Sequence, residues 1–418
     1  MLQSLISPFE FLYSVLTGDS YMMRPTGKWI SLIGLLVFSA STSTTVVGQE
    51  IGLGLMFVGW LILWTKRAAP GTRRVSLEFP IIALAVAWTL STIFALDPVP
   101  SLVNMKKLFL IPIIYGFAWL IEDEKSLRTI VTVMLTVALI VSVYGIISYL
   151  RGSDLEESYR VRATMSSTVT LAGVMLLAFA LSLSLAVSGK AGKKRILFLL
   201  TTVFSFLCLT LTYTRGAWLG AIVAILLTFL LSSGRKKAAS LAALVLIVIA
   251  LLASHHVRER VTSFTQLPEM SIRGRFSMWL SATQVAKDHP LFGVGLMDLK
   301  EVYDRYKRPD SGFRSGHMHS DFFQVLASTG LLGLAAFLWF LRSVCGLLVR
   351  NLLSMERKEC FLRAVCLGSL AGFCGFVTAG IFEWNFGDAE VVSMLYCLIG
   401  LACACTRIQS SERSLASA

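Results

Sequence analysis

Charged side chains are scarce in this chain of 418 residues: Asp, Glu, Lys and Arg make up 15% of it, while hydrophobic residues make up 55%. Soluble domains carry about 25% charged residues. A chain this apolar belongs in a bilayer, where only helices and closed barrels satisfy every backbone hydrogen bond. The apolar runs are long and show no period-two alternation, which excludes membrane strands. The sequence therefore predicts an all-α, polytopic integral membrane protein.

The sequence also lacks disulfide or metal-binding cysteine motifs, a signal peptide and internal repeats, and each absence excludes or disfavours a class of protein. The eight cysteines show no CxxC spacing and fall in or beside apolar runs, so we expect core residues and no disulfide framework. Residues 1–24 lack a basic region ahead of their apolar part, which disfavours a cleaved signal peptide and favours an interfacial helix. The chain shows no internal repeat, a feature that many transporters have.

Twelve apolar segments are long enough to be candidate transmembrane helices. They cover roughly 29–47, 51–65, 78–96, 107–121, 128–150, 166–188, 195–213, 216–232, 239–254, 321–341, 361–382 and 391–406. The second large feature is one long polar segment, 255–320, between the ninth and tenth of them. We therefore predict about 12 spans with one large loop.

The distribution of basic residues predicts the orientation. The net charge of +13 is concentrated in alternate short loops, such as those at Lys66, Lys193 and Lys236. Cytoplasmic loops are enriched in Lys and Arg, so this charge does not indicate a nucleic-acid partner. We expect a plasma (inner) membrane protein with both termini in the cytoplasm and the long polar segment on the periplasmic face.

This orientation predicts three regions. Residues 1–254 form an N-terminal membrane region with nine spans, 255–320 form a helical periplasmic loop, and 321–418 form a C-terminal membrane region with three spans. The stretch SMWLSATQVAKDHPLFGVG predicts one loop helix that ends at Pro290, and LMDLKEVYDRYK predicts a second. All five histidines of the chain lie in the loop.

Several arginines lie at the predicted periplasmic ends of spans, although basic residues are expected mainly at the cytoplasmic ends. Their positions need another explanation. Arg215 stands between TLTYT and GAWLG, and Arg162 stands just before the sixth span. An arginine at this depth is costly unless it is paired or faces a water-filled cavity. Arg273 and Arg275 lie in SIRGRF, where we expect Gly274 to let the backbone bend close to a ligand.

The planar fork of arginine suits phosphate oxygens better than the point charge of lysine does. These four arginines are therefore candidates to bind a phosphate-containing substrate. The alternative is that they snorkel, or pair with the acidic residues Glu156, Glu157 and Asp321.

The stretch SGHMHSDFFQVLASTGLLGL places His317 and His319 two residues apart, just before a long apolar segment. A zinc site needs three or four ligands, and no further ligands stand at a recognisable spacing, so we expect no metal. A histidine can act as a general base near neutral pH. Ser320 is placed to cap the following helix, and a histidine with a purely helix-capping role stays open as an alternative.

Several of these motifs together resemble the O-antigen ligase family, which also includes O-antigen polymerases and bacterial protein O-oligosaccharyltransferases. HPLFGVG and YDRY are followed by His319 and Ser320, then nine residues, then Gly330 and Gly333 of a GxxG element. His317 does not fall on this pattern. RGRFSMW and Arg215 resemble two further arginine positions of the family, and FEWNFGDAEV resembles its ligase branch.

The resemblance implies a GT-C-like fold and transfer of a glycan at the periplasmic membrane face. The donor would be a glycan on undecaprenyl diphosphate, and the acceptor a sugar hydroxyl of lipid A–core oligosaccharide. The reaction would invert the anomeric carbon and use neither metal nor cofactor, because arginines would replace the metal ion.

The resemblance also implies roles for particular residues. His319 would be the general base, and the donor diphosphate would be held by Arg215 and Arg275, with Arg273 and Arg162 as weaker candidates. Acceptor-binding or structural roles fall to the residues of the last motif, Glu383, Asn385 and Asp388. A polymerase or a protein glycosyltransferase would differ only in its acceptor. A polyprenyl-lipid transporter is the alternative from another class, and the nearly charge-free interiors of the spans disfavour it.

Overall fold

The computed structural model describes residues 26–65, 75–153, 155–156, 160–188, 194–232, 269–307, 315–355 and 360–417. Almost all regular structure in these ranges is helical, which confirms the all-α prediction. The first half contains α2 (Thr26–Ser41), α3 (Val46–Thr65), α4 (Glu78–Ile93), α5 (Pro98–Asn104), η1 (Met105–Leu110), α6 (Pro112–Leu120), α7 (Glu124–Arg151), α8 (Thr168–Val187), α9 (Arg195–Leu211) and α10 (Arg215–Leu231).

The second half contains the remaining helices, α13 (Glu269–Asp288), α14 (Lys300–Tyr306), α15 (Asp321–Ser354), α16 (Cys360–Gly380), η3 (Asn385–Gly387) and α17 (Ala389–Ser417). Between α7 and α8, the strand β1 (Leu155–Glu156) pairs antiparallel with β2 (Arg160–Val161).

Seven helical segments are long and apolar enough to cross a membrane, and four shorter apolar helices accompany them. The seven are Val46–Thr65, Pro98–Leu120, Glu124–Arg151, Thr168–Val187, Asp321–Ser354, Phe361–Gly380 and Ala389–Ser414. Together the seven and the four coincide with eleven of the twelve predicted segments, and the other, 239–254, lies outside the described residues. The chain is a multi-pass membrane protein, and the count of twelve stays a prediction.

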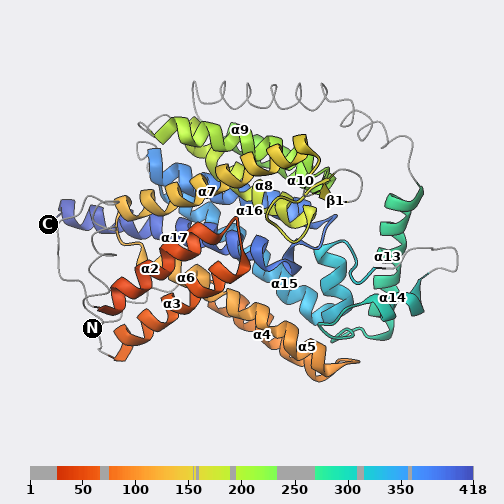
Figure 1. Ribbon diagram of the computed structural model, residues 1–418. Coiled ribbons are helices and arrows are strands. Elements are labelled where there is room, and N and C mark those ends of the chain that lie inside the picture. The colour runs from red at the N-terminus through yellow and green to blue at the C-terminus, as the bar shows by residue number, and fades with distance from the viewer. Residues whose placement is uncertain are drawn as a thin grey trace, which may run out of the picture.

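Helix α8 forms the centre of the bundle (Figure 1). It is hydrophobic all round and nearly every one of its residues is buried, as expected for a helix surrounded by protein. Its neighbours are α7, α9, α10, α16 and α17. The helices α10 and α16 approach each other closely at Gly220 and Gly375, which have no side chains. A Cβ atom on Gly220 would lie only 2.5 Å from the carbonyl oxygen of Gly375.

Helices α13 and α14 lie beyond one end of the bundle, next to the start of α15, whereas α17 ends at the opposite end (Figure 1). The outer helices have a small hydrophobic core of their own, formed by Met278, Ala282, Val285, Val294, Leu299, Val302, Tyr303, Met318 and Ala327. The predicted second loop helix corresponds to α14. The first starts at Glu269, eight residues before the predicted Ser277.

The predicted span 321–341 is the first part of a longer helix, α15, which is broken at Gly330 (φ 65°, ψ −166°). The break frees backbone groups that the segment 290–295 then satisfies. The amides of Leu331 and Leu332 donate to the carbonyls of residues 290 and 291, while the carbonyls of Ala327 and Ser328 accept from the amides of residues 294 and 295. The HPLFGVG motif is thus hydrogen-bonded to the break in α15.

Candidate active site

Glu383 joins the two most prominent candidate residues of the sequence. Its Oε1 atom accepts a 2.6 Å hydrogen bond from Nη2 of Arg275, and its Oε2 atom lies 3.5 Å from Nδ1 of His319. The Glu383 side chain is 6% exposed, whereas those of Arg275 and His319 are 25% and 27% exposed. A buried carboxylate therefore orients a partly accessible imidazole and a partly accessible guanidinium.

Two opposing effects set the protonation of Glu383. Burial raises the pKa of its carboxyl group, but the hydrogen bond with His319 and the positive charge of Arg275 outweigh burial, so the pKa is lowered. Glu383 is consequently ionised at neutral pH. Its carboxylate favours the imidazole tautomer with a proton on Nδ1, which leaves Nε2 of His319 as the proton acceptor.

His319 has an unusual backbone conformation immediately before α15. Its φ angle is +46°, in the left-handed region that residues other than glycine rarely adopt. Strained residues of this kind persist only where surrounding contacts hold them, and they cluster at functional sites. Here Trp279 Nε1 donates to the carbonyl oxygen of Met318, and the Met318 amide donates to Oε1 of Gln324. The residue before His319 is thus fixed from both sides.

Helix α13 places Arg275 at the cluster. Arg275 and Trp279 are four residues apart and share one face of the helix. Trp279 anchors this face by its hydrogen bond to Met318 and by stacking on Phe323 at 5.1 Å between ring centroids. The expected bend at Gly274 was wrong, because Gly274 lies within the continuous helix α13.

The turn between α9 and α10 brings Arg215 to the same end of the bundle. Gly216 lies against the end of α16, because a Cβ atom there would lie 3.1 Å from the carbonyl oxygen of Ala379 and 3.5 Å from Cγ of Glu383. Arg160 steadies the turn, because its Nε donates to the carbonyl of Thr212 at 2.9 Å and its Nη2 donates to Oγ1 of Thr214 at 3.2 Å. Arg160, two residues before Arg162, was not among the predicted site residues.

The structure does not place the side chains of the other two candidate arginines, Arg162 and Arg273, in this cluster. Arg162 is exposed, directly after β2, and forms no side-chain hydrogen bond or ion pair with the described part of the chain. Arg273 lies in α13, but its side chain is outside the described residues. Glu156, Glu157 and Asp321 were the acidic partners considered for the arginines. In the structure Arg275 pairs with Glu383 instead, and Asp321 accepts backbone hydrogen bonds.

Asp321, the first residue of α15, holds the loop that carries Glu383. Its Oδ1 atom accepts a 2.8 Å hydrogen bond from the amide of Phe386, and the amide of Asn385 donates to the same carboxylate. Asn385 is 2% exposed. Gly380 leaves room for this carboxylate, because a Cβ atom there would lie 2.1 Å from Oδ2 of Asp321. No sequence spacing indicated this link between the two ends of the site.

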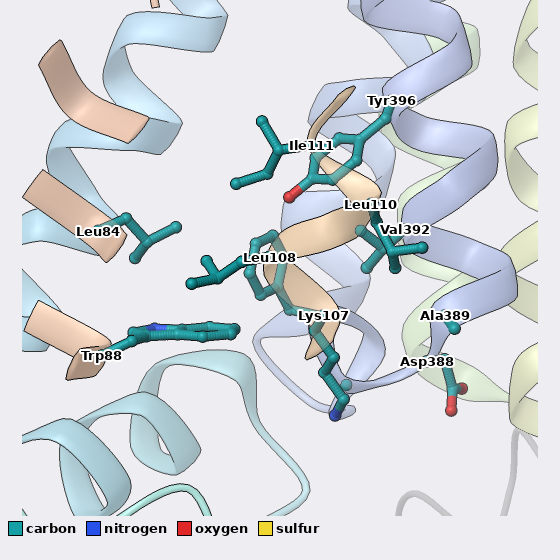
Figure 2. Close-up of a pocket in the computed structure, with 12 residues that line it drawn as sticks. Leu84, Trp88, Lys107, Leu108, Leu110, Ile111, Asp388, Ala389, Val392 and Tyr396 are labelled. Atoms are coloured by element: carbon teal, nitrogen blue, oxygen red, sulfur yellow. The ribbon is translucent and has the colours of Figure 1, made fainter. Parts of the chain in front are cut away.

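Asp388 lies at the end of the same loop, on the wall of a narrow cavity (Figure 2). Burial raises the pKa of Asp388 to about 6, opposed by a 3.0 Å hydrogen bond from Oγ1 of Thr170. Lys107, from η1, lies on the wall of the same cavity and interacts electrostatically with Asp388. Figure 2 shows the apolar remainder of the wall, with Leu84, Leu108 and Val392.

His317 packs directly on His319, with 4.2 Å between the ring centroids. Burial, reinforced by the neighbouring His319, lowers the pKa of His317 to about 4, so this imidazole is neutral at pH 7. The contact places the His317 ring directly beside that of His319. The capping role expected for Ser320 was wrong: Ser320 is the N-cap residue of α15, but its hydroxyl makes no capping hydrogen bond.

The GxxG element has a structural explanation. Gly330 needs its positive φ, and a Cβ atom there would lie 2.5 Å from the carbonyl carbon of Leu291. A Cβ atom on Gly333 would lie 1.9 Å from Oγ1 of Thr329. Both glycines therefore serve the break in α15. Among the described residues, no group of three or more His, Cys, Asp or Glu side chains is placed to hold a metal ion.

These features define a multi-pass helical membrane protein with a His–Glu–Arg cluster at one end of its bundle. Residues 200–338 match the family model described as O-antigen ligase. The matched region contains Arg215, Arg275, His319 and the GxxG element, whereas Glu383 lies beyond it. This match supports an assignment to the O-antigen ligase family, in agreement with the resemblance noted in the motifs. A comparison with curated proteins found no match.

Proposed function

We propose that the protein is an O-antigen ligase, a glycosyltransferase that moves a glycan from undecaprenyl diphosphate to a sugar hydroxyl of lipid A–core oligosaccharide. The observation that carries the proposal is the convergence of His319 and Arg275 on the buried carboxylate of Glu383, beside the Arg215–Gly216 turn. One cluster thus offers a proton acceptor and positive charge together, as transfer from a sugar diphosphate requires.

In the proposed reaction, Nε2 of His319 takes the proton of the acceptor hydroxyl as its oxygen attacks the anomeric carbon. The bond between that carbon and the phosphate oxygen breaks, and the electron pair leaves with the diphosphate. Attack and departure on opposite faces invert the anomeric centre. Glu383 keeps the imidazole oriented throughout.

The leaving diphosphate is held by Arg215 and Arg275 in this mechanism. A guanidinium has five N–H donors, so Arg275 can keep its bond to Glu383 and still donate to phosphate oxygens. Arg273 and Arg162 are secondary candidates for the same role. Because arginines neutralise the leaving group, the proposed reaction needs no metal ion or cofactor.

The proposed setting is a bacterial inner membrane, with about 12 spans, cytoplasmic termini and the cluster at the periplasmic face. In support, α13 and α14 lie at the end of the bundle where the cluster lies, away from the end of α17 (Figure 1). The proposed regions are residues 1–254, 255–320 and 321–418. Cysteines placed at 236 and at 300 should react with an impermeant reagent in spheroplasts only at 300. Labelling at 236 would reverse the orientation.

Reconstitution tests the reaction itself. The purified protein in nanodiscs receives lipid-linked glycan with lipid A–core, with a second lipid-linked glycan, or with a pilin-like peptide. Transfer to lipid A–core alone, with an inverted linkage by NMR, is the expected result. Transfer to the second glycan would make the protein a polymerase, and transfer to the peptide would make it a protein O-oligosaccharyltransferase.

A further inference from the structure

A cavity beside the catalytic cluster contains side chains for which the proposed mechanism has no use. It lies between α4, η1, the segment 296–297, the first turns of α15 and the loop after α16, is partly open to solvent, and measures about 450 Å³ with the open part included. Its wall includes Trp88, Asn104, Lys107, Gln324 and Trp384. We refer to it as the Trp88–Trp384 cavity. It adjoins the cavity of Figure 2, with which it shares Trp88 and Lys107.

Two walls of this cavity are tied to the cluster. Trp384 directly follows Glu383, the carboxylate that contacts both His319 and Arg275. Gln324 accepts a 2.8 Å hydrogen bond from the amide of Met318, the residue before His319. A ligand in the Trp88–Trp384 cavity would therefore contact Trp384, the neighbour of Glu383 in sequence, and Gln324, which is bonded to the residue before His319.

The lining combines broad apolar faces with hydrogen-bonding groups. Two indoles offer flat apolar surface, while an ammonium, two carboxamides and the hydroxyls of Ser328 and Thr329 offer polar contacts. A hydrocarbon tail in this space would remove the ammonium group of Lys107 from water without offering it a partner, at a cost in free energy. A simple anion would leave both indoles unused. A pyranose ring, with apolar C–H faces and a rim of hydroxyls, matches both parts of the lining.

Lys107 supplies the charge in this lining. Its Nζ atom lies 5.7 Å from the ring centroid of Trp384, and Asp388 is its electrostatic neighbour. Within the described ranges, its ammonium makes no side-chain hydrogen bond or ion pair, so its three donors are available to a ligand. Trp88 contributes its indole to the wall of the cavity.

We propose that the Trp88–Trp384 cavity is a saccharide subsite, which binds a pyranose ring of one of the two glycan substrates and thereby orients that glycan for transfer. The inference rests on the proposed function in one respect: it takes the natural ligand to be a glycan. The ring can come from the acceptor or from the donor, and the two sources are separated by experiment.

Binding is measured by calorimetry on the full chain in nanodiscs, without turnover. The two probes are the core oligosaccharide freed from lipid A and the free oligosaccharide of the donor. The variants are Lys107→Gln and Trp384→Phe, with Lys106→Gln as the matched control, because Lys106 is the exposed neighbour of Lys107 and lies outside the cavity lining. Circular dichroism and size exclusion confirm that each variant is folded.

One probe should bind the wild type and Lys106→Gln equally, and bind Lys107→Gln at least about tenfold more weakly, because a charge-assisted hydrogen bond is lost. Trp384→Phe, with a smaller ring, should also weaken binding of that probe. Weakening of the core probe assigns the subsite to the acceptor, and weakening of the donor probe assigns it to the donor. Equal affinities in all four proteins, or no binding of either probe to the wild type, overturns the subsite. Absence of transfer by the wild type would overturn the proposed function and leave the binding result standing.

Discussion

Replacement of Glu383 by glutamine tests whether its carboxylate orients His319, the proposed general base. The substitution keeps the size of the side chain and removes its charge. A glutamine amide can donate to Nδ1 of His319, which would hold the imidazole in the tautomer with its proton on Nε2. That tautomer cannot accept the proton of the acceptor hydroxyl. We therefore expect Glu383→Gln to impair the chemical step while the substrates still bind.

The expected loss of rate in Glu383→Gln follows from the proposed role of His319 as general base. Loss of general-base catalysis costs about 10²- to 10⁴-fold in rate, or about 3 to 5 kcal/mol in the activation barrier. The effect on folding should be smaller. Arg275 loses its partner, but its side chain is 25% exposed and can be hydrated, so we expect a loss of about 1 to 2 kcal/mol. A large fall in kcat with a small fall in stability is the expected signature.

The pH dependence of stability provides a second measurement. The pKa of Glu383 is lowered in the folded protein, so its carboxylate stabilises the fold above the unfolded pKa. That contribution is lost as pH falls through the lower, folded pKa. The difference in thermal stability between wild type and Glu383→Gln should therefore be constant near neutral pH and shrink below about pH 4.

The assay is single-turnover transfer in nanodiscs, with donor binding measured in parallel. Glu390→Gln is the matched control, because Glu390 is the next acidic residue but one in the same motif and lies on α17. It should transfer at the wild-type rate. Full kcat in Glu383→Gln, with unchanged donor binding, would show that Glu383 is structural and that the tautomer argument is wrong.

Four further results are expected. His319→Ala should abolish transfer and keep donor binding, whereas His317→Ala should retain most activity; the reverse outcome would contradict the choice of base. Arg215→Lys and Arg275→Lys should both lose transfer because the bidentate fork is lost, and full activity in either would remove that arginine from the site. Treatment with EDTA followed by dialysis should leave transfer largely intact; activity that returns only with a divalent ion would contradict the metal-free mechanism. Because the pKa of His317 is lowered to about 4, the wild type should lose stability as pH falls from about 6.5 toward 4, and His317→Asn should lose less.

The membrane architecture could be predicted from the sequence because one simple physical requirement governs it. A span needs a long apolar run, and eleven of the predicted segments coincide with apolar helices. The length of α15 was underestimated, since it continues past 341 to Ser354. The start of α13 was also missed, because the stretch at its beginning is polar and carries no capping signal that would separate a helix from a loop.

The candidate residues could be found in the sequence, but their contacts could not. Arg275 and His319 stood out as charged or titratable groups at the edges of apolar segments. Their common partner, Glu383, is 108 residues from Arg275 and 64 from His319. No local periodicity relates positions so far apart. The hydrogen bonds from the 385–386 turn to Asp321, which hold this arrangement in place, are invisible in the sequence for the same reason.

The GxxG element shows how a motif that identifies a family can act at a distance from the chemistry. Gly330 breaks α15 within three turns of His319, and the freed backbone groups bind the HPLFGVG segment that follows α13. Helix α13 carries Arg275, so the break fixes the helix of the arginine against the helix that begins next to the histidine. Gly330 and Gly333 therefore contribute to the site only by shaping the backbone around it. The spacing between His319 and Gly330 follows from this arrangement, because it sets where along α15 the outer helices are attached relative to His319.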